Sequence, residues 1–272
     1  MALITISQSL GSGDTSIARK VAEELDLELF DDRKIKEKAL EIGIRSEDLT
    51  GLDEKAPNFF DRLLSQKPET YLDILKSVVY EICRPGTGVV VGHGSQVLLQ
   101  NFECAFHVLV HASEASRIET IARDMDVTVD IAKKLIRKRD SEHAGFFRYA
   151  FNMRWNEPTL YDLVVNPSKI GFDLTTELII QSARSEEIKA CSLGTLQTME
   201  HLSMERRITA VLKQHDIRIQ TLNVEVPDPG VALIRGFVSN KNERQSIIKT
   251  VSEIPGIKKV EAQIAILEPY AD

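Results

Sequence analysis

The stretch LITISQSLGSGDTSIARKVAEEL, residues Leu3 to Leu25, decides the fold expected of this chain. An apolar strand at its start runs into the turn Gly11-Ser12-Gly13, and a helix follows directly. The helix is predicted because apolar residues recur at three- and four-residue steps, at Ile17, Ala18, Val21, Ala22 and Leu25. A helix start behind a glycine turn attracts anions, so the pattern is typical of a phosphate-binding loop.

Asp14, Thr15 and Ser16 open this helix and are expected to supply capping side chains and free backbone N–H groups. A Walker A loop has a lysine directly after its last glycine, and that position here is Asp14. Its carboxylate would repel the phosphates that the lysine attracts. Two interpretations remain for residues 11–16: a phosphate cradle with the Ser16 hydroxyl on Mg²⁺, or a tight turn that caps a helix.

The chain of 272 residues, 43% apolar and 28% charged, has the composition of a soluble globular protein. Its length suggests one large domain with a smaller one. No apolar run approaches the roughly 20 residues of a membrane span, and the chain opens on a strand without the basic start of a secretory signal. We therefore expect a cytoplasmic protein.

The cysteines and the charge distribution bear on disulfide bonds, a zinc site and nucleic-acid binding. Cys83, Cys104 and Cys191 are odd in number, far apart and without CxxC spacing, so we expect buried or inert thiols and neither a disulfide framework nor a zinc site. The net charge of −7 arises before His201, after which basic and acidic residues are nearly equal in number. Neither part shows a broad basic patch, so nucleic acid is not an expected partner.

Strands and helices alternate along residues 1–184. Continuous apolar runs at 88–92 and 105–110 are typical of strands buried on both faces of a parallel sheet. Helices are predicted at 71–82, after Thr128 and at 174–182, with a last strand at 162–166. The helix after Thr128 should bury one side, made of Ile131, Ala132, Leu135 and Ile136. The alternation predicts an α/β domain with a doubly wound parallel sheet.

A change of pattern follows this domain. Residues 185–200 contain only scattered apolar positions and suit a linker or a short bridging helix. Residues 201–268 then predict the order helix, strand, strand, helix, strand, with breaks at Pro227-Asp228-Pro229-Gly230 and Pro255-Gly256. This order indicates a small second domain of the α+β class, which we expect to fold as a separate unit.

Six blocks of the first domain stand out by their order and spacing. They are ITISQSLGSGDTSIARKVAEEL with LELFDDRKI, LDEKAPNFF at 52–60, GVVVGHGSQVLL at 88–99, HVLVHASEASRIETIA at 107–122, RDSEHAGFFRYAF at 139–151 and YDLVVNPSKIG at 161–171. Together they resemble the cytidylate kinase-like branch of the P-loop nucleoside-monophosphate kinases. The resemblance implies a P-loop NTPase-type fold, ATP and Mg²⁺ as cofactors, and phosphoryl transfer to CMP, dCMP or a related small acceptor.

The same resemblance places residues 139–151 in a lid over the nucleotide. Arg139, Arg148 and Arg154 would then contact the polyphosphate, and Asp140 would help to bind Mg²⁺ or pair with an arginine. Arg117 lies either at the entrance of the lid or on a helix surface. The aromatic residues of this region, Phe146, Phe147, Trp155 and Tyr161, are expected to pack in the core or the lid.

The acceptor nucleotide would lie near Asp31, Arg33 and His93. In this branch a glycine-arginine pair follows the buried strand, and here it is Gly92-His93; a lid arginine is likewise replaced by His143. Histidine is mostly neutral at pH 7. Because phosphoryl transfer depends on cations around the phosphates, the replacements also fit a catalytically degenerate kinase-like sensor.

The second domain resembles a BON domain over residues 204–267. The resemblance rests on VALIRGFV at 231–238, Asn242-Glu243-Arg244 and PGIKKVE at 255–261. It implies a small module that binds a protein partner or a phospholipid surface. Two functions thus remain for the whole chain: an ATP-dependent kinase of small acceptors, or a degenerate kinase-like regulator that acts through its BON-like module.

Overall fold

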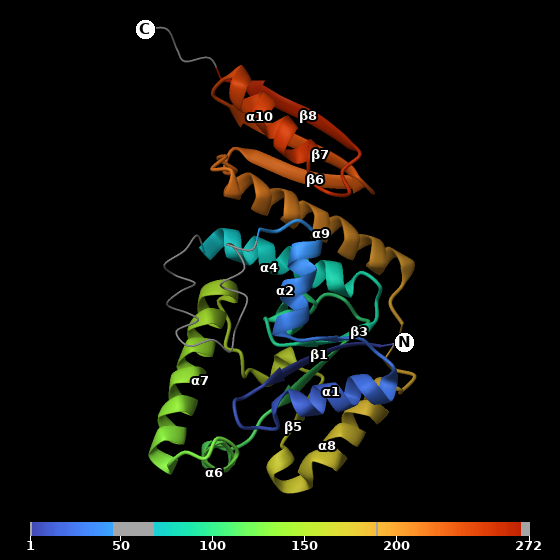
Figure 1. Cartoon of the computed structure of the whole chain (residues 1–272). Helices are drawn as coiled ribbons and strands as arrows, with labels where there is room; N and C mark the ends of the chain where they lie inside the picture. The colour runs from blue at the N-terminus through green and yellow to red at the C-terminus, as the bar shows by residue number, and fades with distance from the viewer. Residues whose placement is uncertain (1, 46–67, 189, 268–272) are drawn as a thin grey trace.

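The computed structural model describes residues 2–45, 68–188 and 190–267, which form two sheets surrounded by helices (Figure 1). The first sheet has five strands in the order β2-β3-β1-β4-β5, and the second has three in the order β6-β7-β8. The block LDEKAPNFF at 52–60 lies outside the described residues.

The bounds of the strands are β1 Leu3–Gln8, β2 Leu29–Phe30, β3 Gly88–Val91, β4 Ala105–Val110, β5 Leu163–Val165, β6 Leu222–Asp228, β7 Val231–Val238 and β8 Lys259–Ile266. The bounds of the helices are α1 Asp14–Leu25, α2 Asp32–Glu41, α4 Pro68–Cys83, α5 Ser95–Leu98, α6 Glu114–Asp124, α7 Val129–Phe151, α8 Pro167–Ala183, α9 Leu193–Gln214 and α10 Lys241–Ser252, with a 3-10 turn at Pro158–Leu160.

The first sheet is parallel throughout, as the continuous apolar runs predict. β1 lies between β3 and β4, with Leu3 opposite both Gly88 and Ala105. Every residue of β3 and β4 is buried, because helices cover both faces of the sheet. The expected α/β fold with a doubly wound parallel sheet is confirmed.

Side chains of this sheet alternate between two cores, one on each face. Ile4 and Ile6 of β1 belong to the core that α1 and α8 cover, which we call the α1 layer. Leu3 belongs to the core that α2, α4, α5 and the end of α7 cover, which we call the α4 layer. The glycine loop leads into the first of these layers and the turn after β3 into the second.

Helix α7 begins as predicted, because the side chain of Thr128 accepts a hydrogen bond from the backbone N–H of Ile131. Its expected apolar side is only half correct. Ala132 and Ile136 are fully buried, whereas Ile131 is 47% and Leu135 36% exposed. Among the described residues, the first half of α7 packs on α6 and on Leu10 in a small cluster around Ile121, which is too narrow to cover a full helix face.

The C-terminal sheet has the predicted order of elements, α9-β6-β7-α10-β8. β6 and β7 are antiparallel, and β8 is parallel to β7. Both helices share one core with the sheet, formed by Ile208, Leu212, Val226, Ala232, Ile234, Val238, Ile247, Val251, Ile254 and Ile264. The small α+β domain is therefore present.

Helix α9 joins the two domains and belongs to both. It starts at Leu193, so the segment expected as a linker or short bridging helix contains the first turns of a long helix. Met199 and Ala210 lie in the core of the α4 layer, while Ile208 and Leu212 lie in the core of the C-terminal domain. In Figure 1 α9 runs beside α4 on one side and beneath the C-terminal sheet on the other.

The cysteines differ from expectation. Cys104 and Cys191 form a disulfide bond across a sequence separation of 87 residues, so two of the three expected free thiols are paired. The fold causes this, because it brings the segment before α9 next to the turn before β4. Cys83 keeps its thiol and is buried, and burial raises the pKa of that thiol well above its ordinary value.

Across residues 2–45, 68–188 and 190–267, no helix has both the length and the apolar character needed to cross a membrane.

Candidate functional site

A cleft of about 950 Å³ opens where the strands of the parallel sheet end. The strand order places β2 and β3 on one side of β1 and β4 and β5 on the other, so the chain diverges at the carboxyl end of β1. Such switch points are where open α/β sheets bind ligands. The cleft walls are the glycine loop, α6, α7 and the start of α8.

The glycine loop has the backbone that only glycine adopts readily. Gly11 has φ +82° and Gly13 φ +134°, both in the left-handed half of the map. A Cβ atom on Gly11 would lie 2.8 Å from the carbonyl oxygen of Arg117, so the loop packs directly on α6. The Ser12 hydroxyl lies 2.7 Å from the carbonyl oxygen of Ser9 and is buried. Ser12 therefore holds the loop shape.

The start of α1 differs from the expected cap. Gly13 is the N-cap residue, and among the described side chains none caps this helix start. The Ser16 hydroxyl instead donates to the carbonyl oxygen of Gly13 at 2.6 Å, and Ser16 lines the cleft. Asp14 is the first helical residue, and its side chain lies outside the described set. A helix start without a side-chain cap retains its attraction for anions.

A buried ion pair supports the loop from behind. Two guanidinium nitrogens of Arg117 lie 3.0 and 2.7 Å from the two carboxylate oxygens of Asp140, and Arg117 also donates to the carbonyl oxygen of Leu10 at 3.4 Å. Arg117 is only 4% exposed, so it does not lie on a helix surface, which was one of the two positions expected for it. Asp140 pairs with this arginine, and both its oxygens are thereby engaged. The pair ties α6 and α7 to the glycine loop.

The expected phosphate-binding arginines are divided between two clefts. Arg139 lines the main cleft, whereas Arg148 and Arg154 line a second one of about 500 Å³, which also borders the Arg117–Asp140 pair. The three Lys and Arg side chains that line the main cleft within the described part of the chain each have a carboxylate nearby. Arg139 lies 3.8 Å and Lys138 4.0 Å from Glu142, while Arg123 lies 2.9 Å from Asp124.

The acceptor residues also separate in the structure. Asp31 lines the main cleft and caps α2 by accepting from the backbone N–H of Lys34 at 3.0 Å. Arg33 forms an exposed ion pair with Glu37 at 2.6 Å and is not among the residues that line the described clefts. His93 is fully buried, and its Nε2 lies 2.8 Å from Asp32 Oδ1.

Sequence reasoning missed Asp32, which lies in the cleft wall and pairs with His93. The available signal is its place directly beside Asp31, a residue expected near the acceptor. His143, in the lid, lines the main cleft and stacks on Trp155 with ring centroids 4.7 Å apart. Phe146, Phe147 and Trp155 are buried, which confirms that the lid aromatics pack in the core.

Two histidines, His107 in β4 and His111 directly after it, bond to hydroxyl groups in β1 and directly after it. His107 Nδ1 lies 2.8 Å from the Thr5 hydroxyl, and His111 Nδ1 lies 2.7 Å from that of Ser9. Burial lowers the pKa of His107, which the carboxylate of Asp162 partly offsets. Burial, with the nearby Arg117 charge, lowers the pKa of His111. Both rings are therefore held in the neutral form.

Acidification from about pH 7 to about pH 5 is expected to lower the unfolding free energy, and His107→Gln is expected to remove part of that loss. The lowered folded-state pKa means that the unfolded chain binds protons more tightly. The stabilisation from the neutral ring is complete above the unfolded pKa of about 6.5 and is lost as the pH falls toward the folded value. Urea denaturation across this range measures it, and the exposed His215→Gln is the matched control. Identical slopes for His107→Gln and the unaltered protein would contradict the assignment.

The donor set of the cleft determines what it can hold. Its volume and its glycine loop fit a nucleotide with its phosphates. Among the described residues no cluster of three His, Cys, Asp or Glu side chains is placed to hold a metal ion. A magnesium ion commonly keeps few protein ligands and is bound with substrate phosphates, so the Ser16 hydroxyl is a fitting ligand. Of the two roles expected for Asp140, the structure shows the pairing with an arginine, because both its oxygens accept from Arg117.

Comparison with known proteins agrees with this geometry. Residues 3–169 match the model of the cytidylate kinase-like family, and residues 203–268 match that of the BON domain. A cytidylate kinase from Archaeoglobus fulgidus is 25% identical over 187 residues, which cover 68% of this chain and 97% of that protein. One from Pyrococcus horikoshii is 23% identical over 168 residues, covering 61% of this chain and 80% of that protein.

A crystal structure of an uncharacterized protein from Eubacterium ventriosum superimposes with a TM-score of 0.50 at 18% identity, over 68% of this chain and 100% of that one. This likeness concerns the fold alone. The match of the family model over more than half of the chain decides the family. The chain belongs to the cytidylate kinase-like family and carries a C-terminal BON domain.

Proposed function

We propose that this protein binds ATP with Mg²⁺ at the glycine loop and transfers the γ-phosphoryl group slowly to CMP, dCMP or a related small acceptor. The observation that supports it most is the glycine loop itself, which lies at the switch point of the sheet, lines a nucleotide-sized cleft and leads into a helix whose N-cap residue is Gly13. We place this activity in the cytoplasm, where a disulfide bond such as Cys104–Cys191 is uncommon.

The residues of the chain contribute in distinct ways. Backbone N–H groups of the loop and of the α1 start bind phosphate oxygens, with the Ser16 hydroxyl beside them. Arg139 and Lys138 approach the polyphosphate from α7, and Asp31 and Asp32 border the acceptor side. The Arg117–Asp140 pair orients the loop. Bound Mg²⁺ would neutralise charge on the transferred group.

A second function, nucleotide sensing without efficient transfer, is favoured by the charges of the cleft. Among the described residues, five carboxylates line it, Asp31, Asp32, Asp124, Asp140 and Glu142, against Arg123, Lys138 and Arg139. An excess of negative charge disfavours a polyphosphate and its transition state. In this function the BON domain would pass the bound state to a protein partner. A phospholipid surface is a weaker candidate, because basic and acidic residues are nearly balanced from His201 onward.

Asp14→Gly is expected to tighten ATP binding about tenfold, equivalent to about 1.4 kcal/mol, because it removes a negative charge from the start of α1. Titration of the full chain with ATP and Mg²⁺, followed by thermal shift or calorimetry, measures the change. Glu142→Gln should act in the same direction, since it releases Lys138 and Arg139 from a shared carboxylate.

Asp26→Gly is the matched control for this prediction. Asp26 ends the same helix, is exposed and has φ +52°, a conformation that glycine accepts readily. The Asp26→Gly substitution removes the same charge at the opposite end of α1 and should leave the affinity for ATP unchanged. Equal affinities for Asp14→Gly and the unaltered protein would place the phosphates elsewhere, and no binding of ATP at millimolar concentration would refute the proposed function.

A further inference from the structure

Helix α9 lies along α4 over a polar stripe. On α4 the side chains at four-residue steps, Glu69, Asp73, Ser77 and Glu81, belong to one face. The residues of α9 that contact this face are Ser203, Arg206, Arg207 and Lys213. The charges are complementary, with carboxylates on α4 and cations on α9. The C-terminal domain is thus attached to the α4 layer through specific contacts.

One end of the stripe is a conventional ion-pair group. The Lys213 ammonium lies 2.7 Å from Asp73 Oδ2 and 3.6 Å from a carboxylate oxygen of Glu69. Arg206 lies 3.7 Å from Asp73. Asp73 and Lys213 are both largely shielded from solvent, whereas Glu69 is exposed, so the Asp73–Lys213 contact dominates here.

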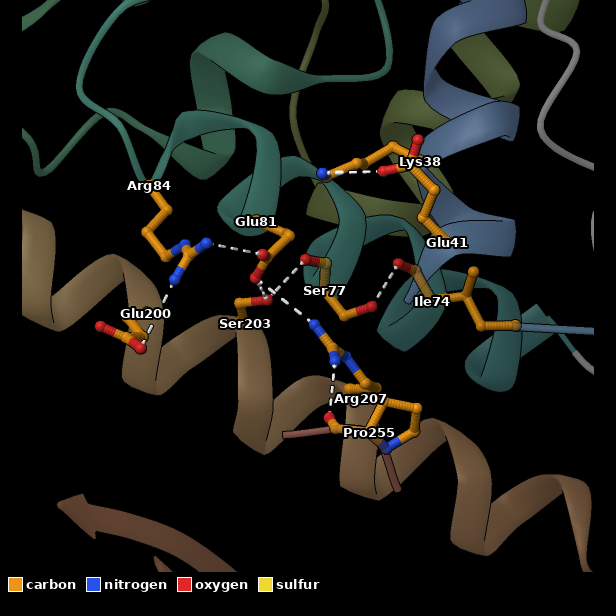
Figure 2. A network of polar contacts seen from close by, with 10 residues as sticks. All are labelled: Lys38, Glu41, Ile74, Ser77, Glu81, Arg84, Glu200, Ser203, Arg207 and Pro255. Atoms are coloured by element: carbon orange, nitrogen blue, oxygen red, sulfur yellow. Dashed lines mark hydrogen bonds and ion pairs between the residues drawn. The ribbon is translucent and has the colours of Figure 1, made fainter. Parts of the chain in front are cut away.

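The other end, shown in Figure 2, is centred on Glu81. The Ser203 hydroxyl lies 3.0 Å from Glu81 Oε2 and 3.1 Å from the carbonyl oxygen of Ser77. Arg207 Nη2 lies 3.4 Å from the same Glu81 oxygen, and Arg207 Nη1 donates to the carbonyl oxygen of Pro255 at 3.1 Å. Pro255 lies in the turn between α10 and β8. Arg207 of α9 therefore bonds both to α4, through Glu81, and to this turn of the C-terminal domain.

Burial makes this contact specific. Ser203 is fully buried and Arg207 only 5% exposed. Burial lowers the pKa of Arg207, which Glu81 partly offsets. A buried arginine that loses its partner, or the reverse, leaves an uncompensated charge and destabilises the contact. The two domains are therefore not free to shift along α9 without breaking the group at Glu81.

Helix α4 is in turn packed against the elements of the acceptor side. Ile35 and Ala39 of α2 share its core, and Figure 2 shows the end of α2 beside α4. The hydroxyl of Tyr80 lies 3.5 Å from the carbonyl oxygen of Leu98 at the end of α5. α2 begins with Asp32, the partner of His93, which precedes α5. The glycine loop, in contrast, continues into α1 in the opposite layer.

We propose that Arg207 and Ser203 are positioning residues for the acceptor side of the cleft. Through Glu81 they fix α4, and α4 fixes α2 and the turn after β3, where Asp31, Asp32 and His93 lie. The BON domain thereby sets acceptor binding, and ATP binding at the α1 layer does not depend on it. The identification of this side with the acceptor rests on the proposed function; the mechanical connection does not.

The test compares Arg207→Met with Arg235→Met in the full chain. Arg235 pairs with Glu225 on the exposed face of the C-terminal sheet and has no part in the α4 contact. Arg235→Met therefore makes the same change of residue in the same domain without touching α4. Without nucleotide, hydrogen exchange of α2 amides should be about tenfold faster in Arg207→Met, and α8 amides should be unaffected. With nucleotides, the dissociation constant of CMP should rise about fivefold or more, and that of ATP should change less than about twofold.

A merely structural role of Arg207 would accelerate exchange in α8 as much as in α2 and weaken both nucleotides together, which would overturn the proposal. Unchanged exchange in α2 would overturn it too. If Arg207→Met does not fold, Ser203→Ala removes only the hydroxyl at Glu81 and is judged by the same comparisons; Arg207→Lys should restore part of the protection. If the unaltered protein binds no CMP, the proposed function fails, while the exchange experiment still decides the mechanical connection.

Discussion

Asp140→Asn is expected to lower the unfolding free energy by about 3 kcal/mol and to weaken ATP binding. The substitution leaves the Arg117 guanidinium buried and facing a neutral amide. Because the Asp140 side chain is 34% exposed, water can reach the pair, and the cost stays at the lower end of the range for broken buried ion pairs. ATP binding weakens because Arg117 also holds Leu10 and the α6 backbone against Gly11. Chemical denaturation and ATP titration of the same samples measure both effects.

Asp124→Asn is the control for stability, because its pair with Arg123 is exposed and should contribute less than about 0.5 kcal/mol. The double variant Arg117→Met with Asp140→Leu separates the two roles. Replacing both charges by apolar groups should restore much of the stability, and the loop would still lack its hydrogen-bonded support. Recovery of full ATP affinity in the double variant would show that the pair contributes stability alone.

The elements of both domains follow from the sequence because their signals are local. The runs at 88–92 and 105–110 show burial on both faces by composition, and the strands β3 and β4 form there. The glycine loop is equally local, since it needs only two positive φ angles and the helix behind it. Even the order of the C-terminal elements is read from turns at Gly230 and Gly256.

Contacts between distant residues do not follow from such signals. Arg117 meets Asp140 across 23 positions and Glu81 meets Arg207 across 126, and neither separation is favoured by any periodicity. Cys104 and Cys191 become neighbours for the same reason. Ile131 and Leu135 show the converse, since a helical period announces an apolar face but not whether a neighbouring element is present to cover it.

Helix α9 shows both a weak local signal and contacts between distant residues. The sequence shows a helical pattern only around Ile208, and the first turns of α9 contain glycine and polar residues that are typical of a linker. The α9 side chains that contact the carboxylates of α4 lie further along the helix, from Ser203 to Lys213. A boundary at residue 201 would therefore cut a helix whose first half packs on one domain and whose second half packs on both, and the C-terminal domain cannot be treated as a tail that is merely tethered.

CMP phosphorylation by the unaltered protein is expected to be slower than about 0.1 per second, whereas ordinary kinases turn over at roughly 1 to 100 per second. One well-placed arginine is worth about 10³ to 10⁵ in the rate of phosphoryl transfer. Here His93 is fully buried and bonds to Asp32, and His143 is stacked on Trp155. Coupled assays of ADP release with CMP, dCMP and UMP measure the rate.

The two histidines should respond differently to restoration of a cation. His143 lines the main cleft, so His143→Arg adds a charge that can reach the phosphates and should raise the rate at least tenfold. His93 is fully buried, and the longer arginine side chain would disturb the turn after β3 and pair with Asp32. His93→Arg should therefore give no gain. The exposed His215→Arg adds the same charge far from the cleft and controls for a general electrostatic effect.

Turnover above 1 per second by the unaltered protein would mean that Arg139 and Lys138 suffice for the transition state. The excess of carboxylates in the cleft would then be compensated by Mg²⁺, and the sensor function would lose its support.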